Sequence, residues 1–492
     1  MSVPELRLRD VNGEPLRPEG EFVLYWMIAA RRTRHSFALE RALDLALELG
    51  KPLVVLEALR CDHPWASARF HAFALGGMAD NARAFEGTGV VYHPYVEPEA
   101  GAGRGLLEAL AARACGVVTD DYPCFFLPAM VQAAGTKLAV RLEAVDGNGL
   151  LPLRATERVF HTAFSFRAFL QRELAPHLAQ RPTPEPLRRN GPPPLRALPQ
   201  EIARRWPAAS PELFALAPAA LAALPVDPGV GRASLEGGAR AGRRALRAFV
   251  TERLADYAEG RNALVDGAAS GLSPWLHWGH VGSHEVLAEL ERDGWSAAQV
   301  AGESCGGKRG AWWNADPERE AFLDQLVTWR ELGFHFALRR PDHDRYGSLP
   351  DWARRTLAEH ADDPRDPCYG RERLEAARTH DELWNAAQRQ LAAEGVMPNY
   401  LRMLWGKKVL EWSASPEEAF EHLVELNNRY ALDGRDPNSY SGIAWTLGRF
   451  DRPWGPERPI FGTVRYMSSD STRRKLDVKP YLERWGAPSL FG

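Results

Sequence analysis

Cysteine is scarce in this sequence, with five residues in 492, and no two of them form a CxxC pair. The paired spacing of zinc and iron–sulfur sites is therefore missing, as is the pattern of a disulfide framework. No apolar run approaches the ~20 residues that a membrane-spanning helix needs. The first residues, MSVPELRLRDVNGEP, lack the apolar core of a signal peptide. We therefore expect a cytoplasmic protein with no metal site and no membrane segment.

A large net charge is also missing, because the formal charge is only −3. The charges are nevertheless unevenly distributed along the chain. From Arg449 to Arg484 there are nine basic and five acidic residues, and residues 232–262 hold seven arginines against four acids. Basic patches of this kind can bind a polyanion. Taken alone, however, each patch fits a solvated face better.

The first 150 residues alternate between apolar, strand-like runs and helical patterns. The strand-like runs are residues 22–27, 52–59, 89–96, 117–121 and 138–145. This alternation predicts a parallel sheet with right-handed crossovers. No GxGxxG follows the first run, where the chain reads AARRTRH, so an ordinary dinucleotide site is not expected. A ligand of such a sheet would still favour the carboxyl ends of the strands.

The length of the chain predicts two or more domains, because it exceeds what one hydrophobic core usually serves. Residues 182–228 carry twelve prolines, which excludes a long helix and indicates a connector lying on the surface. From about residue 235 onward, apolar residues recur at three- and four-residue spacing, which predicts helices. We predict an α/β domain over 1–180, a proline-rich linker over 181–234 and a helical domain over 235–492.

Tryptophan is abundant, with sixteen residues. Trp384 lies on one predicted helix and Trp405 and Trp412 on the next, where a seven-residue separation places both rings on nearly the same face, about 10 Å apart. Aromatic residues at helical spacing are usually core. Polar neighbours such as Asn385 and Arg402 indicate a further role. The pattern alone leaves both interpretations open.

Two polar segments add candidate residues. In SGLSPWLHWGHVGSHEVL (270–287), hydroxyl groups precede a proline and a helix, which suits a phosphate, although a helix N-cap would explain Ser273 equally well. In NNRYALDGRDPNSYSGIAW (427–445), Asp433 belongs either to a surface turn or to an ion pair with Arg402. A buried pair adds little net stability, so it would mark a site that needs a fixed charge.

The order of several motifs is highly specific. YAEGRN, LSPWLHWGH, WREL, THDELWNAAQ, RMLWGKKVLEW, LDGRDPN, GIAW and RYMS follow one another along the chain. With them the chain resembles the photolyase/cryptochrome family, and specifically the class II cyclobutane pyrimidine dimer photolyases. The resemblance covers nearly the whole chain and is strongest in residues 257–290, 322–412 and 427–479. It implies an N-terminal α/β, Rossmann-like antenna domain and a C-terminal all-α domain that holds FAD.

The resemblance also implies roles for individual residues. Asn427 would face N5 of the flavin, and Arg402 and Asp433 would form the salt bridge beside its ring, where positive charge favours an anionic reduced flavin. Trp405, Trp384 and Trp412 would carry electrons from the surface to photoexcited FAD. The full set of implied FAD contacts is Tyr257, Ser270, Leu272, Ser273, Arg402, Asn427 and Asp433.

Damaged DNA is the partner that the resemblance implies, with the dimer flipped out of the duplex beside the flavin. The matching lesion-pocket positions are Arg261, Asn262, Trp329, Met403 and Trp445. Arg458 and Arg465 match a basic C-terminal region that fills the hole or holds the backbone, so binding would depend on salt.

Two positions depart from the class II pattern. Gln325 stands where a glutamate that contacts the dimer is usual, and glutamine brings no charge and cannot give up a proton. The chain reads Met397-Pro398-Asn399 where Met-His-Gly is usual, so a histidine is absent. Neither change touches the implied FAD contacts.

We therefore expect a monomeric light-driven lyase that repairs cyclobutane pyrimidine dimers by electron transfer from excited reduced FAD. The alternative is a photolyase-like flavoprotein without dimer repair, either a blue-light photoreceptor or a light-dependent enzyme on another substrate. A damage binder with a purely structural flavin is a third hypothesis. An antenna chromophore of the deazaflavin type would suit the basic RRTRH segment.

Overall fold

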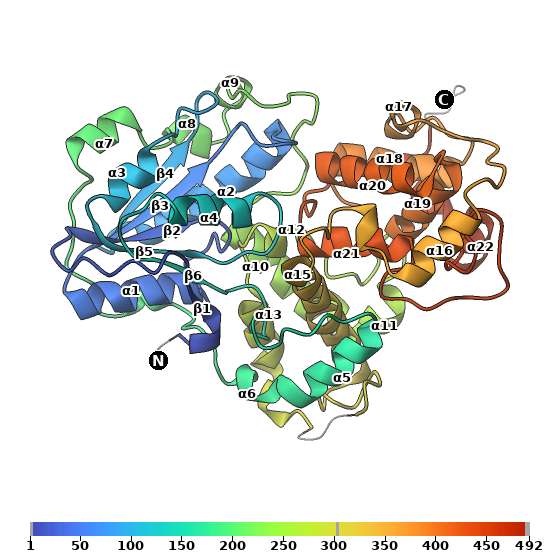
Figure 1. The fold of residues 1–492 in the computed structure, drawn as a ribbon, viewed down its shortest axis with the longest axis horizontal. Helices are drawn as coiled ribbons and strands as arrows, with labels where there is room; N and C mark the ends of the chain where they lie inside the picture. Colours follow the sequence, from blue (N-terminus) through green and yellow to red (C-terminus); the bar gives the residue numbers. More distant parts are fainter. Residues whose placement is uncertain (1–2, 302–304, 488–492) are drawn as a thin grey trace. The chain divides into compact units, whose positions relative to one another are not determined.

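The computed structural model describes residues 3–301 and 305–487 (Figure 1). The chain forms two compact units, and each contains more than one segment of the sequence. The first unit comprises Met1–Thr156, Leu174–Arg247 and Leu272–Ala298. The second comprises Glu157–Glu173, Ala248–Gly271 and Gln299–Gly492. The chain therefore passes from one unit to the other five times. The three consecutive segments expected from the sequence would have required fewer passages.

A six-stranded sheet forms the centre of the first unit, with the strand order β1-β6-β5-β2-β3-β4. Strand β2 pairs in parallel with β3 and β5, and β5 pairs in parallel with β6, so the predicted parallel sheet is confirmed. The edge strand β1, which the sequence did not reveal, runs antiparallel to β6. The strands are β1 (Leu8–Asp10), β2 (Phe22–Met27), β3 (Leu53–Leu59), β4 (Val91–Val96), β5 (Ala114–Asp120) and β6 (Leu142–Val145).

Helices cover both faces of this sheet, which explains why the central strands are apolar throughout. Every residue of β2 is buried, because successive side chains of a strand point to opposite faces. Trp26 packs on one side with residues of α3 and α4, and Tyr25 packs on the other with residues of α1. The covering helices are α1 (Phe37–Leu49), α2 (Ala68–Phe85), α3 (Leu106–Ala111) and α4 (Leu127–Gly135).

The proline-rich stretch is part of the first unit. Its short helices α8 (Pro211–Phe214) and α9 (Pro218–Ala222) pack on α2, and α7 (Gln200–Arg205) packs on α3. Trp206, directly after α7, is buried and donates a hydrogen bond from Nε1 to the Ala102 carbonyl at 3.0 Å. Helices α12 (Ser273–His277) and α13 (Ser283–Leu290) belong to the same unit.

The second unit is helical, as predicted. Helix α19 packs against α18, α20 and α21, and α15 packs against α21. Helix α20 begins at a reciprocal cap, where Ser415 Oγ accepts from the Glu418 amide and the Glu418 carboxylate accepts from the Ala414 amide. Its helices include α5 (Ala163–Glu173), α11 (Tyr257–Gly260), α14 (Pro317–Leu323), α15 (Arg330–Arg339), α16 (Asp351–Glu359), α17 (Arg371–Glu375), α18 (Glu382–Glu394), α19 (Asn399–Trp412), α20 (Pro416–Tyr430), α21 (Pro437–Thr446), α22 (Ser469–Lys475) and α23 (Lys479–Trp485), while α10 (Ala239–Ala248) ends where this unit begins.

Candidate functional site

Three buried indole rings form a continuous stack between α18 and α19. The rings of Trp384 and Trp405 are parallel, with centroids 6.3 Å apart and an interplanar angle of 5°. Trp412 also meets the ring of Trp384, in an edge-on arrangement with a centroid distance of 5.6 Å and an interplanar angle of 71°. Each ring is at most 2% exposed. The rings fill the core, and each also contacts the next, in the order Trp405, Trp384, Trp412. A structural role and a further role of these tryptophans are therefore compatible.

Hydrogen bonds fix the orientation of two of these rings. Trp384 donates from Nε1 to the Trp405 carbonyl at 3.1 Å, and Trp405 donates from Nε1 to Gln388 Oε1 at 2.9 Å. Gln388 is fully buried and was not among the predicted residues. Its position four residues after Trp384, on the same helix face, is the signal that could have identified it.

The far end of the stack meets a tyrosine–histidine pair. Trp412 contacts the rings of His380 and Tyr369 at centroid distances of 5.1 and 5.5 Å. The Tyr369 hydroxyl lies 2.9 Å from His380 Nδ1, and the Tyr369 amide donates to the Trp412 carbonyl at 2.8 Å. These contacts fix the position of the outermost indole.

Arg402 and Asp433 form the ion pair that the sequence left open. Both terminal nitrogens of Arg402 donate to Oδ1 of Asp433 at 3.0 Å. The side chains are 25% and 12% exposed, so the pair is shielded from bulk water without being sealed from it. The Ser439 hydroxyl donates to the Asp433 carbonyl at 2.7 Å and holds the turn after α20 in place.

Asn427 is buried on α20, one residue before a second asparagine. Its Nδ2 donates to Asn428 Oδ1 at 3.4 Å, and that oxygen also accepts from the Arg435 amide at 2.9 Å. Asn428 in turn donates to the Tyr440 hydroxyl at 3.1 Å. The nitrogen of the Asn427 side chain is thus held on the Asn428 side.

The predicted contacts near Tyr257 are divided between the two units. Tyr257 is buried on α11 among the rings of Phe249 and Phe322. Burial raises its pKa, which the guanidinium of Arg261, 5.7 Å from the ring centroid, opposes. Ser270 belongs to the second unit, whereas Leu272 and Ser273 belong to the first. Leu272, rather than Ser273, is the N-cap of α12.

The two candidate lesion residues Gln325 and Trp329 share one π-helical segment, η7 (Asp324–Trp329), between α14 and α15. Such segments are rare and frequent at functional sites. The neighbouring acid Asp324 is engaged, because Arg167 donates to its two oxygens at 2.7 and 3.0 Å. Gln325 is half-buried and makes no hydrogen bond to another described side chain.

Trp445, at the end of α21, lies beside positive charge. The guanidinium of Arg465 is 5.7 Å from its ring centroid, and Arg465 is paired with Asp451 at 2.7 and 3.1 Å. Arg458 is exposed and lies 4.9 Å from the ring of Tyr466. The structure therefore joins Trp445 to Arg465 by contact. Asn262 and Met403 are half-buried positions on the same unit.

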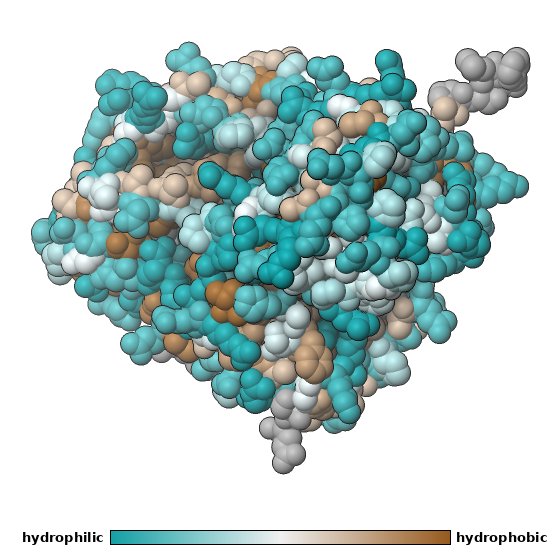
Figure 2. Space-filling view, turned by 45° about the vertical axis from the view of Figure 1, so that its right-hand side comes forward, coloured by the Kyte–Doolittle hydropathy of each residue, from teal (hydrophilic) through white to brown (hydrophobic). Residues whose placement is uncertain are grey.

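The basic residues near the C-terminus do not all lie on a surface. Arg449 is only 2% exposed, donates to the Ser348 carbonyl at 2.5 Å and lies over the rings of Phe336 and Phe450. Arg452, Arg473 and Arg474 are exposed. On the visible face in Figure 2 the surface is mostly hydrophilic. Arg449 must therefore be removed from the predicted basic face.

In the first unit, the segment after β2 is occupied by the protein's own groups. The carboxylate of Asp120 accepts from the backbone amides of Ile28, Ala29 and Ala30 at 2.8, 2.7 and 3.0 Å. The RRTRH arginines are also engaged: Arg31 pairs with Glu57 at 3.1 Å. These amides therefore bind a carboxylate of the chain itself.

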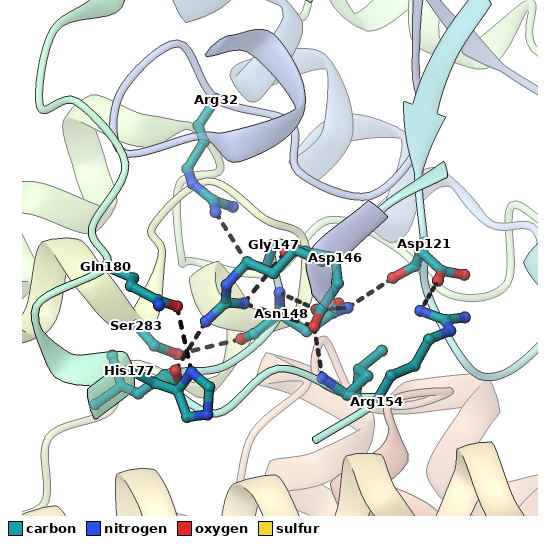
Figure 3. Close-up of polar contacts among 12 residues, drawn as sticks. Arg32, Asp121, Asp146, Gly147, Asn148, Arg154, His177, Gln180 and Ser283 are labelled. Atoms are coloured by element: carbon teal, nitrogen blue, oxygen red, sulfur yellow. Dashed lines mark hydrogen bonds and ion pairs between the residues drawn. The ribbon is translucent and has the colours of Figure 1, made fainter. Parts of the chain in front are cut away.

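The carboxyl ends of β5 and β6 are joined by a similar polar network (Figure 3). Arg32 donates to the Gly147 carbonyl at 3.3 Å, and Asn148 donates to the Asp121 carbonyl at 2.6 Å. Arg154 pairs with Asp121 at 2.6 Å. Burial would raise the pKa of Asp121, but Arg9 and Arg154 outweigh it and hold the pKa below its usual value.

Two features are absent from residues 3–301 and 305–487. Across these ranges, no His, Cys, Asp and Glu side chains gather in groups of three or more that could hold a metal ion. Within the same ranges, no helix combines the length and apolar character needed to cross a membrane.

Two solved structures show which fold the chain adopts. A class III photolyase from Agrobacterium tumefaciens has a TM-score of 0.67 and 17% identity, covering 95% of this chain and 86% of that one. A cryptochrome from Synechocystis sp. PCC6803 has a TM-score of 0.65 and 17% identity, covering 94% and 88%. The fold is that of photolyases and cryptochromes, as the motifs led us to expect.

Sequence comparison shows the family to which the chain belongs. No family model matches the chain. A protein named deoxyribodipyrimidine photo-lyase from Methanothermobacter thermautotrophicus is 33% identical over 479 residues, covering 97% of each chain. The chain therefore belongs to the photolyase/cryptochrome family.

Proposed function

We propose that the protein is a class II photolyase that repairs cyclobutane pyrimidine dimers in DNA with light. The observation that carries the proposal is the buried stack of Trp405, Trp384 and Trp412, in a chain whose relative of nearly equal length is named a deoxyribodipyrimidine photo-lyase. The ordered motifs of the sequence support the class II assignment.

The residues beside the stack fit a flavin. Arg402 lies three residues before Trp405 on α19, and its pair with Asp433 keeps a guanidinium in a half-shielded place. A fixed positive charge there favours an anionic reduced ring. The buried Asn427 amide supplies a hydrogen-bonding group for N5. When bound and reduced, FAD would supply the electron that splits the dimer after absorbing light.

The tryptophans would restore the reduced state of the flavin after oxidation. Each ring lies within 6.3 Å of the next, centroid to centroid. The hydrogen bond from Trp405 to Gln388 holds the ring closest to Arg402 along the helix in one orientation. In this proposal the protein binds and orients the cofactor and excludes water, while the cofactor carries the chemistry.

The lesion pocket would be lined by Arg261, Asn262, Gln325, Trp329, Met403 and Trp445. Aromatic rings such as Trp329 and Trp445 offer stacking surfaces to extruded bases, which cost least to extrude when damaged. Arg458 and Arg465 would hold the opened duplex. Gln325 favours the alternative of a photolyase-like flavoprotein with another substrate, because it cannot bring the charge of a glutamate.

A light-dependent repair assay distinguishes the photolyase from a photolyase-like flavoprotein without dimer repair. Purified, reduced protein is mixed with an oligonucleotide that carries one thymine dimer, and base absorbance is followed in blue light and in the dark. Recovery in the light alone supports the photolyase. No recovery, in protein that contains reduced FAD at about one per chain, favours the alternative. A colourless folded protein would contradict every flavin hypothesis.

The deazaflavin-type antenna and the monomeric state stay predictions. The basic RRTRH segment offers less free charge to an acidic chromophore than its sequence suggests, because Arg31 pairs with Glu57 and Arg34 pairs with Glu185. Release of bound chromophores by denaturation, followed by chromatography, would identify an antenna as a second coloured species beside FAD.

A further inference from the structure

A lysine with no exposed surface lies next to the tryptophan stack on α19. Lys407 is 0% exposed, which is rare for an ammonium group unless it is paired. Lys407 follows Gly406, where a Cβ atom would lie only 2.6 Å from Cγ2 of Thr446. Helices α19 and α21 therefore approach each other closely at Gly406, and Lys407 lies at that contact.

The ammonium group binds the carboxyl end of α21. Nζ of Lys407 donates to the Thr446 carbonyl at 2.6 Å. The amides that follow, of Leu447 and Gly448, bond to the carbonyls of Ala444 and Trp445 instead. The last carbonyls of a helix lack helical partners and carry the negative end of its dipole, so a cation is stabilising there.

The same ammonium group lies beside the ring of Trp445. Nζ is 5.1 Å from the ring centroid, and the guanidinium of Arg465 is 5.7 Å from that centroid. Arg465 is held by Asp451, which also accepts from Trp454 Nε1 at 3.1 Å. The ring is thus held by a cation from α19 and a cation from the segment after α21, and both contacts are attractive.

We propose that Lys407 is a positioning residue for lesion binding: it fixes the end of α21 and thereby the ring of Trp445 against which an extruded pyrimidine dimer stacks. The proposal rests on the photolyase function, in which Trp445 lines the lesion pocket. Lys407 would not touch the dimer. Its effect would reach the dimer through the position of one ring.

The charge of Lys407 is sensitive to pH. Burial lowers its pKa to about 7, Asp451 favours the ammonium form and Arg465 opposes it. On its own helix, the nearest charged groups, Lys408 and Glu411, pair with each other at 2.7 Å. The ammonium charge of Lys407 is therefore lost as the pH rises above neutrality, and Arg465 is then the cation that stays beside Trp445.

The test compares Lys407→Met with Lys408→Met, the neighbouring, almost fully buried lysine, which lies over Trp412 instead. Affinities for a dimer-containing duplex and an undamaged duplex are measured with flavin-loaded full-length protein. We expect Lys407→Met to weaken dimer binding about tenfold, the lower range for losing one base–aromatic stack. Undamaged-DNA affinity, the flavin spectrum and the splitting yield of bound dimer should be unchanged.

The wild-type protein gives a second measurement that requires no variant. Its preference for dimer over undamaged DNA should decline between about pH 6 and 9, and Lys407→Met, where it folds, should show no such decline. Equal dimer affinity in Lys407→Met, equal losses in both variants, or a pH-independent wild-type preference would each overturn the role of Lys407. A wild-type protein that neither prefers nor splits dimers would instead overturn the photolyase function.

Discussion

Acid should destabilise this protein through a buried histidine that the proposed function does not use. His335 on α15 is 3% exposed, and neither ring nitrogen finds a hydrogen-bond partner among the described residues. Its ring lies 5.3 Å from that of Phe166. Burial, assisted by the positive charge of Arg339, lowers its pKa to about 4. His335 is therefore neutral in the native protein well below the pH at which it becomes charged in the unfolded chain.

The sign and size of the effect follow from linkage. A histidine whose pKa is 6.5 unfolded and about 4 folded contributes stability that is complete above about pH 6.5 and is lost as the pH falls towards 4. At pH 5 the loss amounts to about 2 kcal/mol. His335→Phe replaces the ring with one of similar shape that needs no hydrogen bond, so it should remove this loss.

The measurement is urea unfolding, followed by far-UV circular dichroism at about pH 7.5 and pH 5. His335→Phe should unfold within about 1 kcal/mol of the wild type at the higher pH and be the more stable protein at the lower one. His161→Gln, at an exposed position, is the matched control. If the wild type and His335→Phe lost equal stability between the two pH values, the reasoning would be refuted.

Four further predictions concern the proposed site. Trp405→Phe should slow light-driven reduction of the flavin without releasing FAD, because the packed ring is replaced but the indole is lost; unchanged kinetics would return Trp405 to a purely structural role. Gln325→Glu should raise the yield of dimer splitting by restoring a charge, and no gain would show that glutamine is not limiting. Asp433→Asn should lower the free energy of unfolding by about 1 kcal/mol, measured by thermal unfolding, because the pair with Arg402 is only half-shielded. The same variant should bind FAD more weakly. An unchanged FAD affinity would show that the pair is not part of the flavin site. Arg458→Gln should lower the slope of log affinity against log salt by about 1, and an unchanged slope would mean that Arg458 contacts no phosphate.

Local patterns predicted most of the helices and strands. Strand β2 has the predicted bounds, and α1 ends at Gly50, whose left-handed backbone, φ 60°, suits glycine. The beginning of β5 was predicted three residues late, because Ala-Cys-Gly fits the end of a helix as well as a strand. Pairing with β2 decides the matter, since Ala114 lies opposite Phe22 in the sheet. Strand β1 was not predicted, because its polar residues form no apolar run. Its strand conformation depends on pairing with β6, which is distant in the sequence.

In the candidate site, too, local patterns predicted some features and long-range packing decided others. Spacing along two helices predicted the faces that carry Trp384, Trp405 and Trp412, and the motifs pointed to Arg402 and Asp433. The order of the three rings could not be read from spacing, because Trp384 reaches its place in the middle only when α18 packs on α19.

By itself the sequence determined the alternation of strands and helices, their caps and the residue types available for chemistry, because these depend on neighbours within a few turns. Tertiary structure alone decided which polar groups meet: Gln388 with Trp405, Lys407 with the Thr446 carbonyl, and Asp120 with the amides after β2. It also buried Arg449 against two aromatic rings, although the sequence counts it with the basic patch. Burial and long-range pairing arise from packing between helices and strands distant in the chain, and no local pattern contains them.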